Sequence, residues 1–148
     1  MHHFLVFLVT LVISSTAICD QFAKGIVFHD LNGNGTYDKN EPALEGIKVS
    51  NGVDIIRTNA EGEYSLPIKD ESIVFVIKPQ GFMTELDKNN LPKFYYIHKP
   101  KGSVKTHFGG VEPTGLLPES LDFALYKQDE PDEFKVIMFG DPQINNEK

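Results

Sequence analysis

The sequence is short of the residues on which several protein classes depend. Cys19 is the only cysteine among the 148 residues, so no disulfide bond can form within the chain. The 21 acidic residues outnumber the 14 lysines and arginines, and the formal net charge is −7. This charge argues against a nucleic-acid partner, which needs a basic surface. Beyond Ile13 no long segment repeats apolar residues with a helical period, so a helical domain is not expected.

The N-terminus is the most hydrophobic part of the chain. Residues 4–13 form an apolar run, FLVFLVTLVI, which small residues follow. The run is too short for the ~20 residues of a membrane-spanning helix and is typical of a secretory signal. The sequence predicts a signal helix in residues 1–19, cleaved after Ala17 or after Cys19, and a secreted, periplasmic or cell-surface bacterial protein. A second interpretation is a lipoprotein signal, with Cys19 acylated as the only link to a membrane.

Residues 30–41, DLNGNGTYDKNE, have the spacing of a calcium-binding loop, D-x-[DN]-x-[DN]-G-x5-E. Its side-chain oxygens fall at loop positions 1, 3, 5, 9 and 12, which are Asp30, Asn32, Asn34, Asp38 and Glu41. Gly35 permits a sharp turn, and Thr36 follows it with a backbone carbonyl. Calcium binds six to eight such oxygens, so the sequence predicts a calcium site. The alternative is an ordinary polar turn, in which the same residue types are common.

Short β-prone segments, separated by glycine, proline and asparagine turns, follow the loop at intervals of about ten residues. This spacing predicts an all-β fold, an antiparallel Ig-like or prealbumin-like β-sandwich of about seven strands, over residues 24–127. The apolar run of residues 73–77 predicts a central strand buried on both faces. Residues 79–119 are irregular, with one aromatic strand at residues 94–98.

The loop and its flanks resemble the calcium-binding B-type repeats of bacterial surface proteins. The likeness covers residues 25–82, where GxVxxDxNxNGxxDxxExxxxGxxV is followed by NAEGEY at residues 59–64. It implies a small β-sandwich that calcium stabilises.

After an acidic linker at residues 128–133, residues 134–139, which are apolar except for Lys135, lead into Gly140-Asp141-Pro142-Gln143. The pattern predicts a buried strand with a carboxylate at its tip, a common place for a ligand. FKVIMFGDPQ resembles the opening motif of calcineurin-like metallophosphoesterases. Asp141 would then be a metal ligand, with Gln143 in the place of the usual histidine.

Two further segments, residues 91–103 and 121–125, resemble the N-terminal domain of secreted bacterial phosphoesterases of this family, and the whole likeness covers residues 24–145. It implies a parent enzyme that hydrolyses phosphate esters at a two-metal site holding Mn, Fe or Zn. The later family motifs do not occur in the 148 residues, and Asp141 and Gln143 alone cannot hold two ions.

The sequence therefore predicts no catalytic residue in the sandwich. We expect residues 134–148 to be the incomplete start of a catalytic domain, and the chain on its own to be inactive. Its expected partner is its own catalytic domain. The alternative is a calcium-stabilised spacer or adhesion module at the cell surface.

Overall fold

The computed structural model describes residues 21–138 and residue 140. The predicted signal, residues 1–19 with Cys19, lies outside them. The described residues form strands without any helix, and so contain no helix suited to crossing a membrane. The strands are β1 (Gln21–His29), β2 (Lys48–Ser50), β3 (Ile55–Arg57), β4 (Glu63–Ile68), β5 (Ser72–Ile77), β6 (Phe82–Thr84), β7 (Tyr95–His98) and β8 (Phe123–Lys127).

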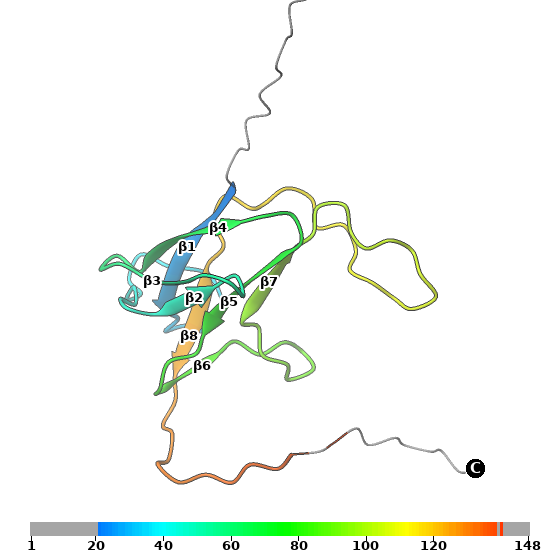
Figure 1. Ribbon diagram of the computed structural model, residues 1–148. Helices are drawn as coiled ribbons and strands as arrows, with labels where there is room; N and C mark the ends of the chain where they lie inside the picture. Colours follow the sequence, from blue (N-terminus) through cyan, green and yellow to red (C-terminus); the bar gives the residue numbers. More distant parts are fainter. Residues whose placement is uncertain (1–20, 139, 141–148) are drawn as a thin grey trace, which may run out of the picture.

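The strands form two four-stranded sheets, with the orders β4-β1-β8-β6 and β3-β2-β5-β7 (Figure 1). The predicted all-β class is confirmed, with eight strands in the described residues rather than seven. The pairing is antiparallel except between β1 and β8, which are parallel with Val27 opposite Phe123 and His29 opposite Leu125. Because β1 and β8 run in the same direction, the segments that follow them leave the sandwich at the same end.

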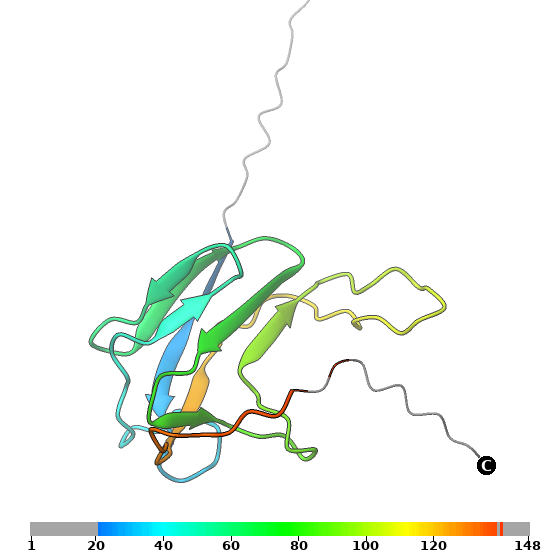
Figure 2. The ribbon, with the colours of Figure 1, turned by 60° about the horizontal axis from the view of Figure 1, so that its bottom comes forward.

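The two sheets enclose a single apolar core (Figure 2). In β4 every second side chain is buried, as expected of a strand with one face on a core. The prediction that residues 73–77 are buried on both faces is wrong, because only Val74 and Val76 of β5 are buried and Ile73 is 47% exposed. Although β5 lies between β2 and β7, each sheet of a two-layer sandwich has only one face on the core.

Strand β1 departs from alternation near its end, where Val27 and Phe28 are both buried. The ring of Phe28 packs against the ring of Tyr37, with 5.2 Å between centroids. The loop that follows β1 therefore folds back over the strand. Earlier in β1, Gly25 lies so close to the backbone of Leu121 that a Cβ atom would sit 2.0 Å from the Leu121 oxygen.

The described part of the apolar C-terminal segment, residues 134–138, forms no strand, and its side chains are exposed. The prediction of a buried strand is therefore wrong for these residues. A strand needs a neighbour that pairs with its backbone and a layer that covers its side chains, and none of the other described segments supplies either.

Candidate metal centre

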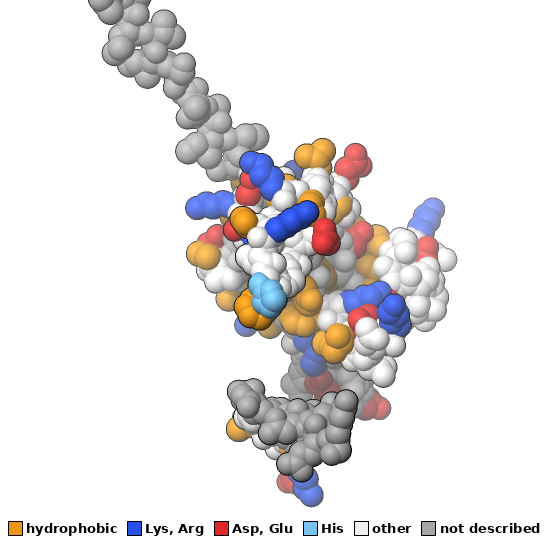
Figure 3. Space-filling view, turned by 90° about the vertical axis from the view of Figure 1, so that its right-hand side faces the viewer, with side chains coloured by type: hydrophobic (Ala, Val, Ile, Leu, Met, Phe, Trp, Pro, Cys, Tyr) orange, Lys and Arg blue, Asp and Glu red, His pale blue; other side chains and the backbone are white. Residues whose placement is uncertain are grey.

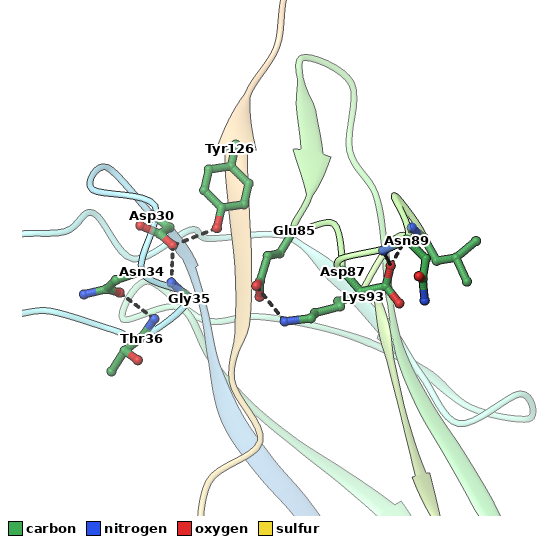
Figure 4. A network of polar contacts seen from close by, with 10 residues as sticks. Asp30, Asn34, Gly35, Thr36, Glu85, Asp87, Asn89, Lys93 and Tyr126 are labelled. Carbon is green, nitrogen blue, oxygen red and sulfur yellow. Dashed lines mark hydrogen bonds and ion pairs between the residues drawn. The ribbon is translucent and has the colours of Figure 1, made fainter.

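The loop of residues 30–41 begins directly after β1 and is tied to β8 by its first residue (Figure 4). The backbone N–H of Asp30 donates to the carbonyl of Leu125 at 3.0 Å. At the other end of the loop, the N–H of His29 donates to the Pro42 carbonyl at 2.8 Å. Both ends of the loop are thus fixed to the sandwich.

The carboxylate of Asp30 organises the first half of the loop. Its Oδ1 atom accepts hydrogen bonds from the N–H groups of Asn32 at 3.2 Å and Gly33 at 2.7 Å. Its Oδ2 atom accepts from the Gly35 N–H at 2.7 Å and the Tyr126 hydroxyl at 2.9 Å. Asp30 is only 2% exposed. Burial raises its pKa, but these hydrogen bonds outweigh burial and hold the pKa below its usual value. The group is therefore ionised at neutral pH.

Glu41 closes the loop. Its Oε1 atom accepts from the N–H of Leu31 at 2.9 Å, and its Oε2 atom accepts from the N–H of Asp38 at 3.0 Å. Glu41 is buried like Asp30. Within the described residues, no lysine, arginine or histidine forms an ion pair with Asp30, Asp38 or Glu41. The loop thus holds its negative charges without a cationic side chain to neutralise them.

The two asparagines converge on Asp38. The Nδ2 atoms of Asn32 and Asn34 donate to Asp38 Oδ2 at 2.7 and 2.8 Å. The Oδ1 atom of Asn34 accepts from the N–H of Thr36 at 2.7 Å. A half-turn of an amide exchanges its oxygen and its nitrogen. Such a turn would present amide oxygens, in place of N–H groups, to a cation beside Asp38.

The donor set fits calcium in type. It consists of three carboxylates, two amides and the Thr36 carbonyl, all of them hard oxygen ligands. Within residues 21–138 and 140, however, no three His, Cys, Asp or Glu side chains come together in a metal-binding group, so Asp30, Asp38 and Glu41 are not gathered around one point. The residues predicted from spacing lie in one loop, but a calcium ion would require the three carboxylates to move closer together and the asparagine amides to turn.

Gly35 has the conformation that the loop pattern requires. Its φ is +72°, a region that favours glycine. A Cβ atom there would lie 3.0 Å from Oε2 of Glu85. Glu85 follows β6 and forms an ion pair with Lys93, with 2.6 Å between Oε1 and Nζ. The loop therefore packs against the connection between β6 and β7 (Figure 4).

Sequence reasoning missed two residues of this cluster, Tyr126 and Glu85. Burial, followed by the hydrogen bond to Asp30 and the nearby charges of Asp30, Glu85 and Glu41, raises the pKa of Tyr126 well above its usual value. The hydroxyl therefore remains a donor to the loop. The predicted phosphoesterase ligands, Asp141 and Gln143, lie outside the described residues.

These features define an all-β sandwich domain with an oxygen-rich loop at one end. A family model described as the N terminal of calcineurin-like phosphoesterase matches residues 31–112, more than half of the chain. The chain belongs to this family, and the predicted resemblance to such N-terminal domains is confirmed. No curated protein matches the chain. The matched residues run from the second position of the loop to beyond β7.

Proposed function

We propose that residues 24–127 are the non-catalytic accessory domain of a secreted calcineurin-like phosphoesterase. Membership of the N-terminal domain family is the observation that carries the proposal. The chain after β8 supports it, because residues 134–138 are apolar except for Lys135 and the sandwich does not cover them. Such a segment needs a separate domain in which to be buried.

In this proposal the domain that begins at residue 134 performs the chemistry. It hydrolyses phosphate esters at a two-metal site holding Mn, Fe or Zn, where the metal ions supply an activated water and charge stabilisation. Asp141 is one of its ligands, and Gln143 stands in the place of a second. The sandwich contributes stability and position to this domain, and no reacting group.

Recovery of the downstream reading frame and expression of the full-length protein tests the proposal. We expect turnover of p-nitrophenyl phosphate or bis-p-nitrophenyl phosphate with Mn²⁺, Zn²⁺ or Fe²⁺. Asp141→Ala should abolish turnover, whereas Asp129→Ala, in the exposed part of the linker, should retain it. Absence of a phosphoesterase domain downstream, or turnover that survives Asp141→Ala, would contradict the proposal.

We further propose that calcium occupies the loop of residues 30–41 and stabilises the sandwich. Two buried carboxylates, Asp30 and Glu41, support this, since ionised groups are rarely buried without a positive partner. Asp38 adds a third negative charge to the same loop. A divalent cation would neutralise most of this charge.

Secretion is also part of the proposal, with residues 1–19 as a signal that is removed, or that ends in an acylated Cys19. Mass spectrometry of the exported protein distinguishes cleavage after Ala17, cleavage after Cys19 and lipidation. An exported protein that retains Met1 would exclude all three.

The second candidate function is a calcium-stabilised spacer or adhesion module at the cell surface. The exposed side chains of Leu91 and Tyr95 favour it, because a binding module needs an exposed apolar surface. The downstream sequence discriminates between the two candidates: further sandwich repeats in place of a catalytic domain would favour the spacer.

A further inference from the structure

An apolar patch lies on the connection between β6 and β7 and at the start of β7. It consists of Leu86, Leu91, Phe94 and Tyr95, whose exposed fractions are 42, 60, 37 and 51%. The rings of Phe94 and Tyr95 meet edge to face, with 5.2 Å between centroids. A cleft of about 510 Å³ adjoins them. Figure 3 views the molecule from this side, with hydrophobic side chains in orange.

The patch lies beside the end of the sandwich from which the chain leaves. The loop of residues 30–41 and the linker both emerge at this end, because they follow the parallel strands β1 and β8. The connection that carries the patch reaches the same end, since Glu85 approaches Gly35 of the loop. The ion pair between Glu85 and Lys93 fixes the connection there.

The linker is attached to the sandwich rather than free. The N–H of Gln128 donates to the Gly81 carbonyl at 2.9 Å, and Glu130 Oε2 accepts from the Gly81 N–H at 2.9 Å. Glu130 also pairs with Lys78. Figures 1 and 2 agree that residues 131–138 run from β8 toward the side of the molecule where the β6–β7 connection lies. The chain is thus guided toward the patch.

The reach of the linker is short. Six extended residues span at most about 20 Å, and two of the six linker residues, Gln128 and Glu130, are attached to the turn before β6. A domain that begins at Phe134 must therefore lie close to the turn before β6, at the end of the sandwich that the β6–β7 connection also reaches. The side chain of Phe134 already lines a cleft with Gln80 and Pro131, on the turn and in the linker.

We propose that the apolar patch is the docking surface for the domain that begins at Phe134. The proposal deepens the proposed function, because it names the surface through which the accessory domain holds the catalytic domain. Docking buries the exposed rings of Phe94 and Tyr95 and fixes the orientation of the two domains. Domains joined by so short a linker lose little further freedom when they dock, so a modest apolar contact is sufficient.

The test uses the full-length protein and the Glu-specific cleavage of the linker at Glu130 and Glu133. The double variant Leu91→Ser/Tyr95→Ser removes the centre of the patch. The control is Val53→Ser, which is also exposed, at 89%. Val53 lies at the other end of the sandwich, near the start of β1. Its neighbour Asn51 donates to the carbonyl of Pro67, and Pro67 pairs with Phe22 in β1.

We expect the linker of the double variant to be cleaved about tenfold faster than that of the wild type, since cleavage follows the population of the undocked form. Val53→Ser should be cleaved at the wild-type rate. Hydrogen exchange in β1 and β4 verifies that the sandwich remains folded in each variant. Equal cleavage rates in the double variant and the control, with the sandwich folded, would overturn the proposal.

Phosphate-ester hydrolysis, measured separately, distinguishes this proposal from the proposed function. If the enzyme is active and its linker is cleaved at the same rate in all variants, the docking proposal is overturned and the proposed function stands. A downstream domain without activity, but with faster cleavage in the double variant, overturns the phosphoesterase assignment and retains the docking surface.

Discussion

The hydroxyl of Tyr126 donates to Oδ2 of Asp30 at 2.9 Å and so joins the last strand of the sandwich to the first residue of the calcium-type loop. The two residues are 96 positions apart in the chain. They meet because β1 and β8 pair in parallel, which places the end of one strand beside the end of the other. The linker begins directly after β8. The same strand therefore holds both the loop and the start of the linker.

Tyr126→Phe should weaken the fold, because it removes a hydrogen bond to an ionised carboxylate. Such a bond contributes about 1.5 kcal/mol or more, and the free energy of unfolding in urea should fall by about that amount. Tyr95→Phe, which removes an exposed hydroxyl on β7, is the matched control and should leave the free energy unchanged. An equal loss of unfolding free energy in both variants would show that the hydrogen bond to Asp30 does not stabilise the fold.

Calcium should stabilise the wild-type sandwich by about 2.7 kcal/mol when its free concentration is 100-fold above the dissociation constant. Asn34→Ala removes a proposed ligand from an exposed position of the loop and should reduce this gain. Asn40→Ala, at a loop position that supplies no ligand, should retain it. The measurement is thermal unfolding in CaCl₂ and in EDTA. Identical midpoints in the two solutions for the wild type would exclude the calcium site.

Gly25→Ala should destabilise the sandwich strongly, because the new Cβ atom would lie 2.0 Å from the carbonyl oxygen of Leu121. Relief requires β1 to move away from the segment that leads into β8. Steric overlap of this kind typically costs about 1–3 kcal/mol. Gly109→Ala is the control, since its Cβ would meet no atom within 4 Å. Denaturant unfolding measures both, and a stable Gly25→Ala protein would contradict the close approach.

The fold class followed from local pattern. Alternation of buried and exposed residues, as in β4, depends on neighbours two positions apart and is visible in the sequence. Strand β6 was not predicted, because its three residues are too few to show a period. The parallel pairing of β1 and β8 joins segments almost a hundred residues apart and has no local signal. The apolar run at residues 73–77 gave a wrong prediction of burial on both faces, because the side chain of Ile73 is exposed to solvent.

The residues of the candidate site also fall into two groups: those that the sequence predicts and those that only the fold brings together. The positions of Asp30, Gly35 and Glu41 follow from the geometry of one loop, so their spacing predicts them. Tyr126 reaches the loop from β8 and Glu85 from the connection between β6 and β7, and only the folded chain brings them there. The phosphoesterase ligands Asp141 and Gln143 stay predictions, carried by resemblance.

The ion pair between Lys78 and Glu130 should make the attachment of the linker depend on pH. The bond from Lys78, followed by that from the Gly81 N–H, lowers the pKa of Glu130 from its ordinary value of 4.5. A carboxyl group whose pKa is lower in the folded state stabilises that state fully above the unfolded value. This contribution is lost as the pH falls through the lowered folded value.

Glu130→Gln should therefore melt below the wild type at pH 7, and the difference should disappear as the pH falls from about 4.5 through the lowered pKa of Glu130. Glu133→Gln, also in the linker, is the matched control and should follow the wild type at every pH. Melting temperatures between pH 7 and pH 2 give the comparison. A difference between Glu130→Gln and the wild type that persists unchanged into acid would mean that the side chain acts by shape and not by charge.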